Sequence, residues 1–75
     1  TPTRSPESFV NEADTLYREG KLSRAIDAYE EAILSDPENP SNYVELSRIQ
    51  ILAGEYDDAL ENAELALLLN PNNPL

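Results

Sequence analysis

The sequence predicts an all-α fold of four antiparallel helices, arranged as two helix-turn-helix repeats of an α-solenoid. Two observations support this: the chain matches itself when it is shifted by 34 residues, and proline and glycine recur where helices would begin and end. A fixed period of roughly 20 to 50 residues is typical of architectures in which each unit packs on its neighbour.

The 34-residue shift aligns residues of several kinds. It pairs Pro6 with Pro40 and Pro74, Gly20 with Gly54, Ala25 with Ala59, Ala32 with Ala66, Pro37 with Pro71, and Asn39 with Asn73. Apolar positions follow: Phe9 with Tyr43, Val10 with Val44, Leu22 with Tyr56, Ile26 with Leu60, and Ile33 with Leu67. Chance would rarely align prolines, glycines and aromatic residues together. We therefore divide the chain into a tail (1–5), a first repeat (6–39), a second repeat (40–73), and residues 74–75, which begin a missing third repeat or form a C-terminal tail.

The first repeat is expected to contain helices over 6–19 and 22–35. Ser5 before Pro6 places a side-chain acceptor at the N-cap and a proline at the first helical position. Gly20 ends the helix, since glycine adopts the left-handed conformation without steric penalty. The second helix carries one apolar stripe and stops before Pro37. That stripe consists of Leu22, Ala25, Ile26, Tyr29, Ala32 and Ile33.

The second repeat is expected to follow the same plan, with helices over 40–53 and 56–69. Asn39 and Pro40 begin the third helix, Gly54 ends it, and Pro71 limits the fourth. The fourth helix repeats the stripe with Tyr56, Ala59, Leu60, Ala63, Ala66 and Leu67. Short turns predict antiparallel helix pairs, and the alanines allow them to approach closely.

Composition excludes several partner classes. Fifteen acidic and five basic residues give a net charge of −10, which disfavours nucleic acid and anionic membrane surfaces. The longest apolar run, Leu65 to Leu69, is too short to span a bilayer. We expect a soluble protein, most simply a cytoplasmic one, and the absence of an initial Met suggests a fragment of a larger protein.

Nothing in the sequence favours catalysis. Because His and Cys are both absent, we expect no enzyme, no cofactor and no metal site, and we interpret the carboxylates as surface charges. Asp57 and Asp58 are adjacent and diverge on a helix, and Glu30, Glu31, Glu61 and Glu64 fall on solvated faces. The segment SDPENPSN lacks the alternating acids and central glycine of a calcium loop.

These residues resemble the tetratricopeptide repeat, a 34-residue helix-turn-helix unit. Signature positions in the second repeat hold Tyr43, Leu46, Gly54, Tyr56, Ala59, Ala66 and Pro71, and those in the first hold Phe9, Ala13, Leu16, Gly20, Ala25, Tyr29, Ala32 and Pro37. Glu12 and Gln50 depart from the usual apolar residues, and we expect Gln50 to be semi-buried and hydrogen-bonded. The resemblance implies an α-α superhelix that binds another protein, with the first helix of each pair lining a concave groove.

Carried over residue by residue, the groove positions are Val10, Asp14, Tyr17, Arg18, Val44, Arg48, Ile51 and Leu52. Their spacing puts each set on one helical face. On one interpretation, the apolar members bury ligand side chains and Arg48 donates to a carboxylate or a backbone carbonyl. On the other, these residues pack between helices and the arginines pair with acids such as Asp14 or Glu45. Family members that clamp acidic C-terminal tails have lysine and asparagine where this chain has Val10, Asp14 and Glu45, so that mode is disfavoured.

A second candidate surface is the end of the last helix. Leu65, Leu67, Leu68 and Leu69 are expected to be exposed and to support self-association into a homo-oligomer. Two function hypotheses follow: a module that binds a peptide segment of a partner in its groove, or a structural or self-associating segment that spaces domains without a peptide ligand.

Overall fold

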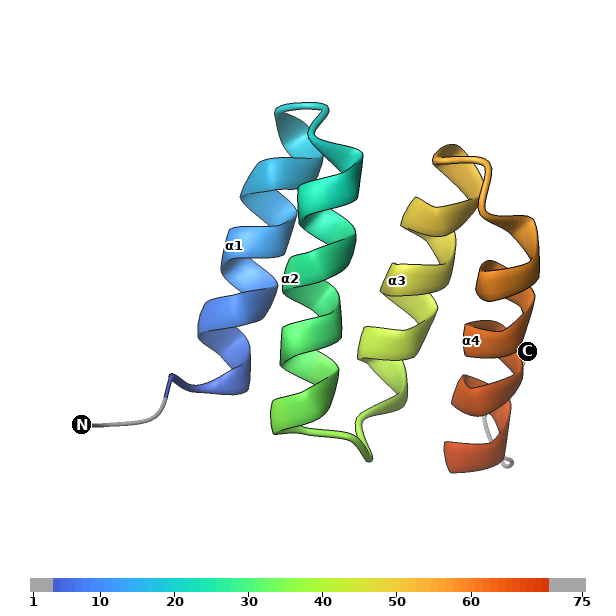
Figure 1. Cartoon of the computed structure of the whole chain (residues 1–75). Coiled ribbons are helices and arrows are strands. Elements are labelled where there is room, and N and C mark those ends of the chain that lie inside the picture. Colours follow the sequence, from blue (N-terminus) through green and yellow to red (C-terminus); the bar gives the residue numbers. More distant parts are fainter. Residues whose placement is uncertain (1–3, 71–75) are drawn as a thin grey trace.

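Four helices stand side by side in chain order and alternate in direction (Figure 1). The computed structural model describes residues 4–70, and its helices are α1 (Pro6–Arg18), α2 (Leu22–Ser35), α3 (Pro40–Leu52) and α4 (Tyr56–Leu69). The all-α helical-repeat fold predicted from the sequence is confirmed. Pro71, Asn73 and the expected start of a third repeat lie outside the described residues.

Both repeats begin as their capping residues predict. The Ser5 side chain accepts a hydrogen bond from the Ser8 N–H at 3.3 Å, and Asn39 Oδ1 accepts one from the Ser41 N–H at 3.1 Å. A proline occupies the first position of α1 and of α3, where its missing N–H leaves no intrahelical bond unmade.

Glycine ends α1 and α3 in the left-handed conformation that the sequence predicted. Gly20 has φ 78° and Gly54 has φ 82°. Around them the Lys21 N–H donates to the Leu16 carbonyl at 2.9 Å, and the Glu55 N–H donates to the Gln50 carbonyl at 2.8 Å. These bonds close the last turn of each helix and reverse the chain. The helices therefore end one residue before the expected 19 and 53, which serve as C-caps.

The core lies where α2 packs between α1 and α3. Ala13 on α1 and Ala25 on α2 are fully buried, and Leu46 on α3 is 2 % exposed. The other buried members are Leu16, Ile26, Ala28, Tyr29 and Ile49, and Val10, Leu22 and Ile33 pack against their edge. The small residues bring α1 and α2 close together, and Ile26 and Tyr29 fill the space toward α3.

The contact between α3 and α4 contains a buried polar pair. The Asn62 side-chain N–H donates to Gln50 Oε1 at 2.7 Å. Gln50 is 3 % exposed, so it is hydrogen-bonded as expected but more deeply buried than the sequence suggested. Ala59 and Ala66, the two buried apolar residues of α4, complete this contact.

Candidate functional site

An open cleft of about 400 Å³ lies where α1, α2 and α3 meet. Five of the eight groove residues named from the sequence line it: Asp14, Tyr17, Arg48, Ile51 and Leu52. They come from α1 and α3, which lie on opposite sides of α2 in the helix row (Figure 1). Residues more than thirty positions apart in sequence thus share one hollow.

The other three predicted residues lie outside this cleft. Val10 is half-buried and packs against the core. Arg18 is exposed and binds Asp14 from beside the cleft. Val44 lines a second hollow between α3 and α4. The alanines at 63 and 66 line that same hollow, and their small side chains leave open space beside Val44.

Three further lining residues were not among the sequence candidates: Tyr29, Glu45 and Ile49. Tyr29 belongs to α2, whose stripe indicated a core role, and the residue is 5 % exposed. Ile49 is also a core residue, exposed by 4 %. Both form the inner wall of the cleft. Glu45 also lines the cleft; the sequence indicated it as a possible partner of the arginines and as an obstacle to acidic tails, but not as a groove residue.

The arginines of the predicted groove are paired with acids. Arg18 Nη2 lies 2.7 Å from Asp14 Oδ2, and Arg48 Nη1 lies 3.3 Å from Glu45 Oε1. This pairing matches the alternative interpretation of these arginines. Both guanidinium groups remain largely exposed, so the pairs contribute little to stability. Within residues 4–70, most N–H groups of these two guanidinium groups make no internal hydrogen bond.

The Tyr29 hydroxyl on the inner wall of the cleft is influenced by nearby charges as well as by burial. The pKa of the Tyr29 hydroxyl is raised first by burial and then by Glu45 and Asp14, while Arg48 acts in the opposite direction and more weakly. A raised tyrosine pKa means that the phenolate is disfavoured there. The two carboxylates therefore outweigh the guanidinium at this point.

The charged groups of residues 4–70 form no arrangement suited to holding a metal: no three His, Cys, Asp or Glu side chains cluster for one. Glu30, Glu31, Glu61 and Glu64 are exposed, as expected of surface charges. Among the helices of residues 4–70, none combines the length and apolar character required to cross a membrane.

The leucines at the end of α4 are exposed, but they do not share one face. Leu67 is 60 % exposed, whereas Ile33, one repeat earlier, is partly buried against the core. Leu68 is 75 % exposed and its counterpart Leu34 is 76 % exposed. Leu67 therefore lies on the face of α4 whose equivalent on α2 is partly buried. Leu68 lies on a face that is exposed in both repeats. Leu65 and Leu69 are 37 % and 38 % exposed.

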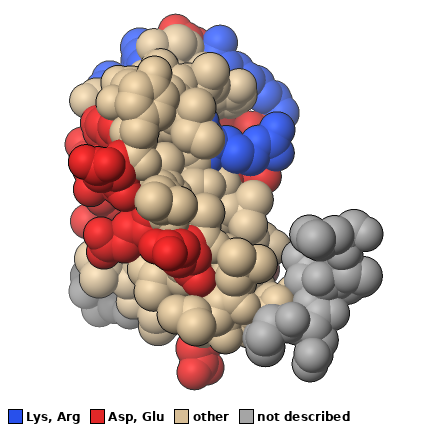
Figure 2. All heavy atoms as spheres, turned by 90° about the vertical axis from the view of Figure 1, so that its right-hand side faces the viewer, with Lys and Arg blue, Asp and Glu red and all other residues tan. Residues whose placement is uncertain are grey.

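We call the exposed residues Tyr56, Leu60 and Leu67 the end face of α4. They are 67 %, 61 % and 60 % exposed. Figure 2 views the molecule from the side of α4 and shows uncharged atoms along much of it, bordered on one side by Asp and Glu. More than half of each of these side chains is exposed, so the other helices of residues 4–70 cover the end face only in part; Leu67 also lines the hollow between α3 and α4.

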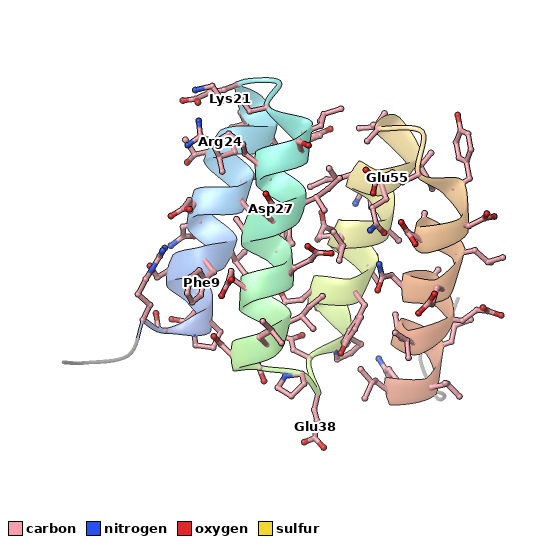
Figure 3. The ribbon with its side chains drawn as sticks, viewed as in Figure 1. Phe9, Lys21, Arg24, Asp27, Glu38 and Glu55 are labelled. Carbon is pink, nitrogen blue, oxygen red and sulfur yellow. The ribbon has the colours of Figure 1, made fainter. Side chains whose placement is uncertain are left out.

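A third hollow lies over α1 and α2, where Phe9, Arg24 and Asp27 are found (Figure 3). Arg4 crosses it, with its guanidinium 4.0 Å from the centre of the Phe9 ring. The same group donates to Ser8 and lies 3.0 Å from Glu12. Glu12 is thus exposed and paired at this surface, and Arg4 and Glu12 both line the hollow.

Comparison with known proteins agrees with this architecture. The tetratricopeptide repeat family model matches residues 16–75. The chain is also 36 % identical over 67 residues to the tetratricopeptide repeat and J domain-containing co-chaperone DNJ1 of Cryptococcus neoformans var. grubii. That match covers 89 % of this chain and 13 % of the fungal protein, so the chain spans only a small part of the length of its relative.

Proposed function

The chain belongs to the tetratricopeptide repeat family, and we propose that it binds a peptide segment of a partner protein in the cleft between α1, α2 and α3. Repeats of this family generally mediate protein–protein interactions and are generally not catalytic. The proposal extends that general role to one surface of this chain and treats the chain as a non-catalytic module. The related co-chaperone is a much longer protein, and we propose that this chain too acts as one segment of a larger protein.

The observation that carries the proposal is the mixed lining of the cleft. Ile51 and Leu52 are 52 % and 60 % exposed, although aliphatic side chains of this size are usually buried. Polar groups stand beside them on the same cleft. A concave surface with apolar contacts and a few polar groups is the usual form of a ligand site.

Arg48 is suited to holding a peptide backbone. Its Nη1 donates to Glu45, and its side chain is 70 % exposed. A guanidinium carries five N–H donors in a planar fork, so donors remain for a ligand carbonyl. Apolar ligand side chains would cover Ile51 and Leu52, and Arg48 would fix the direction of the backbone.

The test compares partner capture by the wild-type chain with capture by Ile51→Asp and Leu52→Asp. Both positions are exposed, so the variants should retain the helical circular dichroism of the wild type. We expect each variant to lose a partner that the wild type retains. Unchanged capture by both folded variants would overturn the assignment of the cleft. Leu34→Asp, at an exposed position that does not line the cleft, is the control and should retain binding.

The exposed end face of α4 favours a second candidate function, self-association. Leu65, Leu67, Leu68 and Leu69 are all at least 37 % exposed, and Leu67 joins Tyr56 and Leu60 on one face. Association of two copies would remove this apolar surface from water. A stack of only two repeats also has few neighbour contacts to stabilise it, so self-association would raise its stability.

Sedimentation at increasing protein concentration tests this second function. We expect a concentration-dependent oligomer that Leu60→Asp with Leu67→Asp converts to a monomer. Leu34→Asp with Leu68→Asp, on the face that is open in both repeats, should leave the oligomer intact. A monomer at high micromolar concentration, with a high melting temperature that is independent of concentration, would rule self-association out.

A further inference from the structure

We infer that the cleft selects a basic and apolar peptide, with a lysine or arginine side chain beside Asp14 and Glu45 and an aliphatic side chain on Ile51 and Leu52. This inference rests on the proposed function, because it names the chemistry of the peptide that the same cleft would take. Its basis is the charge, the aromatic surface and the apolar wall of the cleft.

The charges that line the cleft favour a cation. Two carboxylates, Asp14 and Glu45, face one guanidinium, that of Arg48. Arg18 neutralises part of the Asp14 charge from outside the lining. The whole chain carries a net charge of −10, which attracts basic peptides and repels acidic ones at long range.

Each carboxylate retains capacity to accept a hydrogen bond. Within residues 4–70, the internal ion pairs engage Asp14 Oδ2 and Glu45 Oε1. The second oxygen of each group is therefore able to accept from an ammonium or guanidinium donor. The two side chains are 46 % and 45 % exposed, so a ligand can reach them without displacing the core.

Two tyrosines provide aromatic surface in the same cleft. Tyr17 is 42 % exposed on α1, and Tyr29 lies on the inner wall. Cations are attracted to the faces of aromatic rings, and a long lysine or arginine side chain also packs its methylene groups against them. The raised pKa of the Tyr29 hydroxyl agrees with this, since Glu45 and Asp14 contribute to it more than Arg48 opposes it.

The aliphatic part of the ligand is specified by the exposed apolar residues of the lining. Ile51 and Leu52 are adjacent residues at the end of α3 and present exposed apolar surface. A peptide with a leucine or isoleucine near its basic residue would cover this surface and place its cation near the acids. A peptide with only charged residues would leave the apolar surface exposed to water.

Fluorescence anisotropy with three labelled peptides tests the inference on the 75-residue chain. The peptides share their length and their leucine and alanine positions, and they carry lysine, glutamine or glutamate at two fixed positions. We expect the lysine peptide to bind most tightly and the glutamate peptide most weakly. The advantage of lysine over glutamine should shrink as salt is raised to about 0.15 M and beyond.

A matched pair of variants separates the effect of a carboxylate in the cleft from the effect of the net charge of the chain. Glu45→Gln removes a carboxylate that lines the cleft, and we expect it to weaken binding of the lysine peptide by about two- to fivefold more than binding of the glutamine peptide. Glu38→Gln makes the same chemical change on an exposed side chain that points away from the helices at the turn between α2 and α3 (Figure 3). It should leave the affinities of both peptides close to those of the wild type.

The outcomes distinguish this inference from the function on which it rests. Equal affinity for the lysine and glutamine peptides, or equal losses in Glu45→Gln and Glu38→Gln, would overturn the selection for a cation. If Ile51→Asp still abolished binding in that case, the cleft would remain the binding site. If no peptide bound, or if Ile51→Asp had no effect on binding, both the inference and the proposed function would fail.

Discussion

Helices α2 and α4 occupy equivalent positions in their repeats, yet large residues of their apolar stripes have opposite environments. Ile26 is 6 % exposed on α2, and Leu60, thirty-four residues later, is 61 % exposed on α4. The alanines behave alike, with Ala25 fully buried and Ala59 at 2 %. The alanine positions face the partner helix within the repeat, whereas the larger residues face the next repeat.

This difference shows that burial in a stack of repeats is set by the neighbour as much as by the pattern. α3 packs against α2 and covers its large residues. The structure places no helix of residues 4–70 in the equivalent position on α4. One side of each second helix thus stabilises its own repeat. The other side is a contact surface, and its contribution to stability depends on what covers it.

The largest expected effect comes from truncating the equivalent side chains on these two helices. Ile26→Ala should lower the free energy of unfolding by about 2–4 kcal/mol, because it leaves a cavity between α2 and α3. Leu60→Ala should change it by about 0.5 kcal/mol or less, because that side chain is already in contact with water. Urea titrations followed by circular dichroism measure both, with trimethylamine N-oxide added to keep Ile26→Ala folded at low urea.

Equal losses in the two alanine variants would contradict the comparison. A large loss in Leu60→Ala that grew with protein concentration would show instead that a second copy covers the end face. Ala25 and Ala59 provide a control pair: both are buried, so Ala25→Gly and Ala59→Gly should each lower stability by a similar amount, about 1 kcal/mol.

The contact between the two helices of each repeat gives the next expected effect. Gln50 and Asn62 form the hydrogen bond between α3 and α4, and the residues thirty-four positions earlier are Leu16 and Ala28. Asn62→Ala should cost about 1–3 kcal/mol, since it leaves the buried Gln50 amide without its partner. The double variant Gln50→Leu with Asn62→Ala reproduces the apolar pair of the first repeat and should recover most of that loss.

The four variants of this pair form a double-mutant cycle measured by urea unfolding. A double variant less stable than Asn62→Ala alone would show that the second repeat cannot accept the apolar arrangement of the first. The two repeats would then be equivalent in the arrangement of their helices but not in the side chains that their interiors accept.

Local features of the fold could be predicted from the sequence because they depend on a few neighbouring residues. Ser5 and Asn39 cap their helices, and Gly20 and Gly54 adopt positive φ, as short-range chemistry requires. The exposure of Leu60 could not be predicted in this way. Its stripe matches that of α2, and only the arrangement of helices shows that Ile26 is covered and Leu60 is not.

Residues of the candidate site could be predicted where they share one face of a single helix. Asp14 with Tyr17, and Arg48 with Ile51, lie on single faces and do line one cleft. Tyr29 was missed because it reaches the cleft from α2, which requires knowing how α2 lies between α1 and α3. Val44 shares a helix with Arg48 but lies in the other hollow, because α4 packs on that side of α3.

The smallest expected effect comes from Tyr29. It is confined to α2, since the equivalent residue of α4 is Ala63. Burial, followed by Glu45 and Asp14, raises the pKa of the Tyr29 hydroxyl above its ordinary value of 10.0. The folded chain therefore holds this proton more tightly than the unfolded chain does. The resulting stabilisation is fully present below about pH 10 and is lost as the pH rises through the folded pKa.

Free energies of unfolding measured between about pH 9 and 11 should fall for the wild type and fall less steeply for Tyr29→Phe. The two proteins differ only at residue 29, so the difference between the two curves isolates Tyr29. Asp14→Asn with Glu45→Gln should also reduce the slope, but by less, because burial is the larger cause. Parallel curves for the wild type and Tyr29→Phe would show that the inner wall of the cleft does not oppose the phenolate.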